Sequence, residues 1–267
     1  MLLRRLAVAA VFIPIIIFLI LRGGILFLAF VCCVIGIGML EFYQSEGADS
    51  PYIRFRDIFL SLFIPVAVYF RGEKILPSII TLIIFIVFFW EIFKLRVYNA
   101  QINIALSIGA ILYISYLFSY TLIIRGIPKV GARLTITIFF VTWMADTGAF
   151  TVGKLLGKHR FFPEYSPHKS VEGFLGAIGF SLIATMVSSF WISLPFLHLV
   201  ILGFLIGTTG EIGDLFESML KRSIGIKDFG KILPGHGGII DRFDSLFFTS
   251  PIFFYYLKYL VGFGRIG

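Results

Sequence analysis

Charged residues are concentrated near the end of the chain, although only 14% of its 267 residues are charged. The stretch from Ser218 to Asp244 contains five cations, Lys221, Arg222, Lys227, Lys231 and Arg242. Cations packed this closely suit a partner that carries several phosphates. Hard carboxylate oxygens of the kind that Mg²⁺ prefers lie beside them, on Asp214, Asp241 and Asp244. Cations next to a carboxylate-held metal predict chemistry on a polyphosphate.

Each piece of this stretch also has a simpler interpretation. Lys and Arg at the end of a membrane helix commonly set its orientation against anionic lipid. A Gly-Gly pair such as Gly237-Gly238 is commonly only a turn, although such a turn also lets backbone N–H groups approach a phosphate. Orientation, however, does not call for three aspartates beside the cations, so the combination favours a site.

The stretch resembles the signature of the phosphatidate cytidylyltransferases, also called CDP-diacylglycerol synthases. That signature runs Ser-x-apolar-Lys-Arg, then Lys-Asp after four residues, then Pro-x-His-Gly-Gly-apolar-x-Asp-Arg-apolar-Asp. The matching positions are Ser218, Leu220, Lys221, Arg222, Lys227, Asp228, Gly230, Leu233, Pro234, His236, Gly237, Gly238, Ile239, Asp241, Arg242, Phe243 and Asp244. The resemblance implies conversion of CTP and phosphatidic acid to CDP-diacylglycerol and pyrophosphate with Mg²⁺ or a similar divalent ion. It also implies a homodimer.

Composition indicates which elements must position these residues. The chain is 58% hydrophobic, contains 32 Phe and has a mean hydropathy of +0.97. Such a composition predicts an all-α, polytopic integral membrane protein, because helices satisfy their own backbone groups in lipid. About nine spans near the ~20 residues that a bilayer needs are predicted, with eight or ten as alternatives. Their ranges are 6–21, 25–42, 57–70, 75–93, 102–124, 134–152, 171–193, 196–217 and 244–262.

Two regions are expected within this bundle. Residues 1–130 are predicted to form a transmembrane scaffold, and residues 131–267 a catalytic region with cytoplasmic loops 153–170 and 218–243. The basic, apolar start of the chain resembles a signal peptide but lacks a small-residue cleavage site, so it is expected to be the first helix. Adjacent Cys32 and Cys33 indicate helix packing and no disulfide framework.

The distribution of cations predicts the orientation. Of the 23 Lys and Arg, 15 fall at the N-terminus and in the connections after spans two, four, six and eight, and eight fall on the other side. This bias places the N-terminus and both motif-bearing loops in the cytoplasm, for a protein of the inner cell membrane. The formal charge of +8 forms no continuous basic face, so no nucleic-acid partner is expected.

The sixth predicted span carries a carboxylate, Asp146, inside an apolar segment. A charge in lipid is costly, so Asp146 is expected to face a polar cavity, with an ion pair to Lys154 as the alternative. The loop that follows leads through Lys169 to Ser170, which is expected to cap the next helix and to direct its N-terminus at an anion. Asp-Thr-Gly-Ala from residue 146 and Ser-Pro-x-Lys-Ser from residue 166 resemble the same family more loosely.

The eighth predicted span places Glu211, Asp214 and Ser218 along one helical face. Asp214 and Asp241 are predicted as the principal ligands of one or two ions, Mg²⁺ or a similar divalent cation, and Asp244, Glu211 and Asp146 as additional ligands. The predicted catalytic residues are Asp214, Asp241, Lys221, Arg222 and His236. Predicted substrate-binding residues are Lys169, Ser170, Lys227, Asp228, Gly237, Gly238, Arg242 and Ser218. The pattern does not decide whether His236 contacts phosphate or acts as an acid.

Two other functions fit parts of the sequence. A CTP-dependent kinase of a polyprenol or phytol would share the metal and nucleotide site but would transfer the γ-phosphate. An ion-coupled transporter would also place acids within the membrane. Transport sites normally lie near the midplane between inverted repeats, and this sequence has its acids near one face and no visible repeat.

Overall fold

The computed structural model describes residues 2–45, 51–94, 99–230 and 237–262 and, outside residues 2–9 and 51–53, their side chains. Within these ranges the protein is helical, and its one β-type pairing is an isolated bridge between Arg160 and Ser170. The prediction of an all-α membrane protein is confirmed.

Each predicted span lies on a helix, in the predicted order. The helices are α1 (Leu2–Arg22), α2 (Gly24–Ser45), α3 (Pro51–Arg71), α4 (Leu76–Phe93), α5 (Ala100–Ala110), α6 (Leu117–Arg125), α7 (Gly131–Leu156), α8 (Val171–Ser188), α9 (Phe196–Ser223) and α10 (Ile240–Tyr256). A short 3₁₀ turn, η1 (Glu73–Ile75), precedes α4, and two π-helical turns are η2 (Ile111–Tyr116) and η3 (Leu257–Val261). Because η2 joins α5 to α6, these three form one span.

Six of the described helical segments are long and apolar enough to cross a membrane. They are α2, η1 with α4, α5 through α6, α7, α8 and α9. The protein is therefore a multi-pass membrane protein, but a count of nine crossings is not confirmed. In α1 the described apolar part is only Ala10–Arg22, and α10 has 17 residues with charges in its first turns.

The outer surface of the bundle is apolar, as a protein surrounded by lipid requires. Along α4, the rings of Phe85, Phe89 and Phe93 follow one another, and Phe93 is 78% exposed. The buried core lies where α10 passes through the bundle. There the Phe118 ring of α6 packs against Phe243 and Phe247 of α10.

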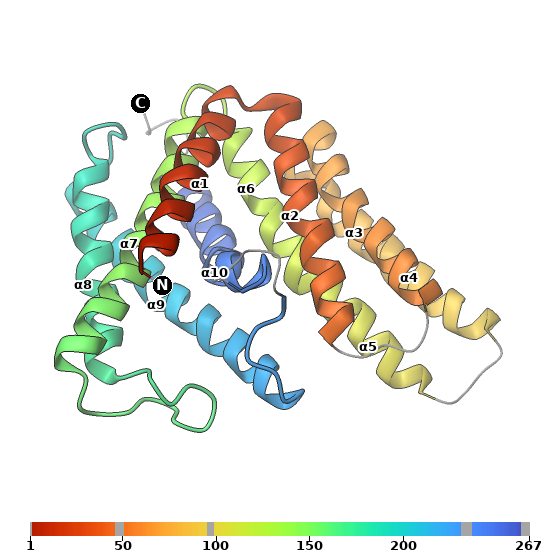
Figure 1. Cartoon of the computed structure of the whole chain (residues 1–267). Helices are drawn as coiled ribbons and strands as arrows, with labels where there is room; N and C mark the ends of the chain where they lie inside the picture. The colour runs from red at the N-terminus through yellow and green to blue at the C-terminus, as the bar shows by residue number, and fades with distance from the viewer. Residues whose placement is uncertain (1, 46–50, 95–98, 231–236, 263–267) are drawn as a thin grey trace.

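Helices α7 to α10 position the polar residues. The loop between α7 and α8 and the connection between α9 and α10 lie at the same end of the bundle (Figure 1). Small residues bring the helices close. A Cβ on Gly207 would lie 2.4 Å from Ser181 Oγ of α8, and one on Gly213 would lie 3.0 Å from the Asp244 carbonyl of α10. Carboxylates on α9 and α10 therefore share a narrow space.

Candidate active site

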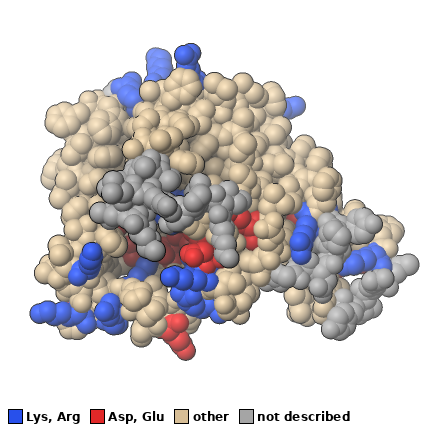
Figure 2. Space-filling model, in the orientation of Figure 1, with Lys and Arg blue, Asp and Glu red and all other residues tan. Residues whose placement is uncertain are grey.

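A cavity of about 660 Å³ opens between α7, α9, α10 and the loop that joins α7 to α8. Figure 2 shows acidic side chains gathered in a hollow in the lower half of the molecule, with Lys and Arg along its lower edge. Three separate stretches of the chain supply these acids, as the sequence predicts. Seven carboxylates line the cavity: Asp146, Glu211, Asp214, Glu217, Asp228, Asp241 and Asp244.

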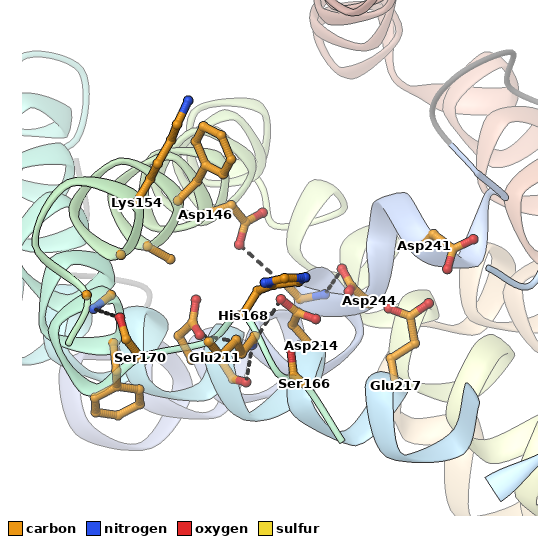
Figure 3. Close-up of a pocket in the computed structure, with 18 of the residues that line it drawn as sticks. Asp146, Lys154, Ser166, His168, Ser170, Glu211, Asp214, Glu217, Asp241 and Asp244 are labelled. Carbon is orange, nitrogen blue, oxygen red and sulfur yellow. Dashed lines mark hydrogen bonds and ion pairs between the residues drawn. The ribbon is translucent and has the colours of Figure 1, made fainter. Parts of the chain in front are cut away.

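Three of the carboxylates converge to the spacing of a metal site. One oxygen from each of Asp214, Glu217 and Asp244 lies within 4.8 Å of the others (Figure 3). Glu217 is only 1% exposed, and neither of its oxygens accepts a hydrogen bond from the described residues, although Lys221 Nζ lies 3.2 Å from Oε1. Carboxylates this close together, one of them fully buried, need a cation or a proton between them. The donor set therefore fits a hard divalent ion.

Lys169 connects the loop to two of the acids on α9. Its ammonium nitrogen lies 3.0 Å from a carboxylate oxygen of Glu211 and 2.9 Å from one of Asp214. Burial alone would lower the pKa of Lys169, but the two carboxylates outweigh burial and raise it. The side chain is therefore a permanent positive charge on the wall of the cavity.

Asp241 makes a different set of contacts from the group of three. Its Oδ1 lies 2.9 Å from Lys221 Nζ, and its Oδ2 accepts hydrogen bonds from the N–H groups of Phe229 at 3.1 Å and Gly238 at 2.7 Å. Gly237 takes a positive φ of 79°, which turns the chain into α10. Asp241 thus ties the α9–α10 connection to the first turn of α10, and its role as a metal ligand stays a prediction.

Asp146 reaches the cavity from the interior of α7. It accepts a hydrogen bond from Ser245 Oγ at 3.1 Å, and the N–H of Ser245 donates to Asp244 at 2.7 Å. Lys154, the alternative partner, forms no ion pair with Asp146 among the described residues. Its ammonium lies 5.7 Å from the centre of the Phe150 ring. Asp146 therefore faces the polar cavity, as the sequence predicts.

The loop before α8 is held by its own hydrogen bonds. Ser170 caps α8 as predicted, because its hydroxyl accepts from the Gly173 N–H at 3.1 Å. Glu172 accepts from the backbone N–H groups of Lys158 and His159. On α9, the Ser218 hydroxyl donates to Asp214 at 3.4 Å. Substrate binding by Ser170 and Ser218 stays a prediction.

The predicted phosphate-binding cations divide into two groups. Lys169, Lys221 and Arg242 line the cavity. Asp228, Arg160 and Lys154 line it too. Arg222 and Lys227 are exposed and are not among the described lining residues. Arg222 donates to the carbonyls of Tyr165 and Ile226 instead. Lys231 and His236 lie outside the described residues.

Glu217 is the acidic residue that the sequence-based assignment missed. It lies three residues after Asp214 and four before Lys221, so the helical period places it on the face of α9 that carries both. That spacing is the signal that could have identified it.

The similarity of this chain to known proteins extends over most of its length. The model of the cytidylyltransferase family matches residues 3–260. The chain belongs to this family. Among curated proteins, the cytidylyltransferase-family chain is 41% identical over 150 residues to the phosphatidate cytidylyltransferase of Bacillus subtilis, covering 55% of this chain and 56% of that protein.

Two staphylococcal relatives of this family member carry the same name. The phosphatidate cytidylyltransferase of Staphylococcus haemolyticus is 44% identical over 124 residues, and that of Staphylococcus aureus strain COL is 42% identical over 124 residues. Each alignment covers 46% of this chain and 48% of the relative. The chain therefore matches about half the length of these curated relatives.

Proposed function

We propose that this protein transfers the cytidylyl group of CTP to phosphatidic acid, which yields CDP-diacylglycerol and pyrophosphate. The observation that carries the proposal is the convergence of Asp214, Glu217 and Asp244 beside two buried lysines at one end of a membrane bundle. Relatives named phosphatidate cytidylyltransferase support the choice of substrates.

The donor set is suited to Mg²⁺ or a similar divalent ion, held by Asp214, Glu217 and Asp244, with Glu211 and Asp146 as further oxygen donors. The bound ion would neutralise negative charge on the triphosphate and on the leaving pyrophosphate. Seven carboxylates in one cavity supply enough oxygen donors for a second ion.

The protein's own groups position the reactants. Lys169 and Lys221 pair with different acids, and each ammonium lies within 3.2 Å of two carboxylates. In the reaction, an oxygen of the lipid phosphate forms a bond to the α-phosphorus of CTP, and the bond from that phosphorus to the bridging oxygen breaks. Pyrophosphate leaves with the electron pair. A phosphate monoester is already a nucleophile, so no covalent protein intermediate is needed.

The bundle allows both substrates to reach one place. Lipid reaches the cavity from the membrane, and CTP from the aqueous end, where both motif loops lie (Figure 1). The excess of Lys and Arg on that side supports a cytoplasmic orientation in the inner membrane. We further propose that the protein works as a homodimer, as the family resemblance implies.

The proposal is tested by incubating purified protein with phosphatidic acid and CTP labelled in the α-phosphate. Label should enter the lipid, and pyrophosphate should appear in equal amount. The Asp214→Asn variant, purified in parallel, serves as the inactive control. Release of CDP, or label confined to water-soluble nucleotide, would contradict cytidylyl transfer and favour a CTP-dependent lipid kinase.

A further inference from the structure

A carboxylate from the scaffold half reaches the start of α10. Glu41, in the last turns of α2, is 1% exposed. Its Oε2 accepts hydrogen bonds from the backbone N–H groups of Ile239 at 2.7 Å and Ile240 at 3.2 Å. These N–H groups belong to the first turn of a helix, where no partner exists within the helix itself. Glu41 therefore caps α10 from 198 residues away.

The same carboxylate explains two glycines of the signature stretch. A Cβ on Gly238 would lie 2.5 Å from Glu41 Oε2, and a Cβ on Gly230 would lie 2.1 Å from Oε1. Neither glycine has the left-handed φ that glycine favours, so close approach is the reason that the site needs them. Any larger residue would have to displace the carboxylate from the N-terminus of α10.

Contacts next to Glu41 link α2 to the α9–α10 connection and to the site. The Phe42 ring stacks on Phe229 with centres 6.1 Å apart, and the N–H of Phe229 donates to Asp241. Asp241 in turn pairs with Lys221. Phe42, the residue after Glu41, is thus linked through Phe229 and Asp241 to Lys221 on the cavity wall.

We infer that Glu41 is a positioning residue. It fixes the Gly237–Gly238 turn and the first turn of α10 so that Asp241 holds Lys221 toward the nucleotide phosphates and Asp244 lies at the ion. The kinetic consequence of this inference rests on the proposed function, whereas the contact between Glu41 and α10 is independent of it. The helix N-terminus favours a negative partner, which explains why the position carries a carboxylate.

The contact can be tested without any activity. Hydrogen–deuterium exchange of the purified protein should be measured for peptides that cover residues 237–245. Glu41→Ala should speed exchange of the Ile239 and Ile240 amides about 10-fold, the scale of losing a helix cap. Gln44→Ala, an exposed position on the same helix, is the control and should leave exchange unchanged. Equal exchange in wild type and Glu41→Ala would overturn the inference.

The functional consequence is tested by kinetics with CTP and phosphatidic acid. Glu41→Ala should lower kcat/KM for CTP about 10- to 100-fold, as for other groups that orient ligands. Glu41→Gln keeps an accepting oxygen, so it should fold normally and retain more activity than Glu41→Ala. A Glu41→Ala variant with wild-type kcat/KM would contradict the inference, as would a Glu41→Gln variant as impaired as Glu41→Ala.

A double-mutant cycle separates positioning from general stability. Gly238→Ala should be strongly impaired in the wild-type background, because its methyl group displaces the Glu41 carboxylate. In the Glu41→Ala background the same change should cost far less, since the clash is gone. Equal losses in both backgrounds would overturn the inference. If the wild-type protein makes no CDP-lipid, but amide exchange is faster in Glu41→Ala than in wild type, the proposed function is refuted and the Glu41 contact still stands.

Discussion

The two halves of the molecule each bury a cluster of charged side chains, and the clusters differ in how their charges are matched. In the scaffold, Arg56 lies 2.7 Å from Asp57 and 4.0 Å from Glu91, and it donates to Ser107. Lys94 lies 3.7 Å from Glu91. Tyr43 donates its hydroxyl proton to Asp57. Two cations thus face two carboxylates.

The cavity has a different balance. Seven carboxylates and five Lys and Arg line it, so acids are in excess, and Lys169 and Lys221 form ion pairs with four of the acids. Glu217 is buried like Glu91 of the first cluster, and both lie near cations without accepting a hydrogen bond from the described residues. The two clusters therefore differ in their ratio of acids to cations. Buried charges that are matched in number hold helices together. A buried excess of one charge favours binding of a ligand of the opposite charge.

Breaking the matched cluster should have the largest effect, and on stability alone. Arg56→Met leaves Asp57 buried without its ion-pair partner and removes one of the two cations near Glu91. Loss of one member of a buried pair costs about 3 to 5 kcal/mol. The free energy of unfolding in detergent should fall accordingly, with unchanged turnover per folded molecule. Arg71→Met, an exposed position on the same helix, is the matched control. Equal stability of the two variants would contradict the claim that the ion pairs around Arg56 stabilise the fold.

Changing the unmatched cluster should affect catalysis instead. Asp214→Asn and Asp244→Asn keep their volume and each remove one charge, so kcat should fall about 10²- to 10³-fold without loss of stability. The double variant should be little worse than either single one. Initial rates over a range of Mg²⁺ concentrations provide the measurement. Near-wild-type turnover with unchanged Mg²⁺ dependence would rule out this cation site.

Asp241 lines the cavity, but its charge is paired with Lys221 and its other oxygen accepts from backbone amides. Asp241→Asn weakens its pair with Lys221 but keeps an acceptor for the amides, so we expect a loss of about 10- to 100-fold. The loss should include a raised KM for CTP, since Lys221 is no longer held in place. A larger loss than in Asp244→Asn, with lost Mg²⁺ dependence, would instead make Asp241 the ligand that the sequence predicts.

Much of the fold could be predicted because hydropathy and helical period are local. The long apolar runs gave the order of the helices, and the face that carries Glu211 and Asp214 follows from their spacing. The number of membrane crossings could not be fixed in this way. Segments such as α3 and α10 combine an apolar part with charges that the folded bundle, not lipid, surrounds.

The site was predicted less completely, for a related reason. Asp241 and Asp244 lie one turn apart in the sequence, but only Asp244 joins Asp214 and Glu217, because Asp241 is held by Lys221 and by backbone amides. Those contacts depend on how the connection folds back. Glu41 gave no local signal, since its partners lie about 200 residues further along the chain.

The central claim is that the unmatched carboxylates hold a divalent ion. Mn²⁺, which favours the same oxygen ligands as Mg²⁺, can be titrated into purified protein and the free ion followed by electron paramagnetic resonance. Wild type should bind Mn²⁺, and Glu217→Gln should bind it at least about 10-fold more weakly. Glu91→Gln, which alters a carboxylate of the matched cluster, should bind like wild type. Identical Mn²⁺ binding by wild type and Glu217→Gln would contradict the claim.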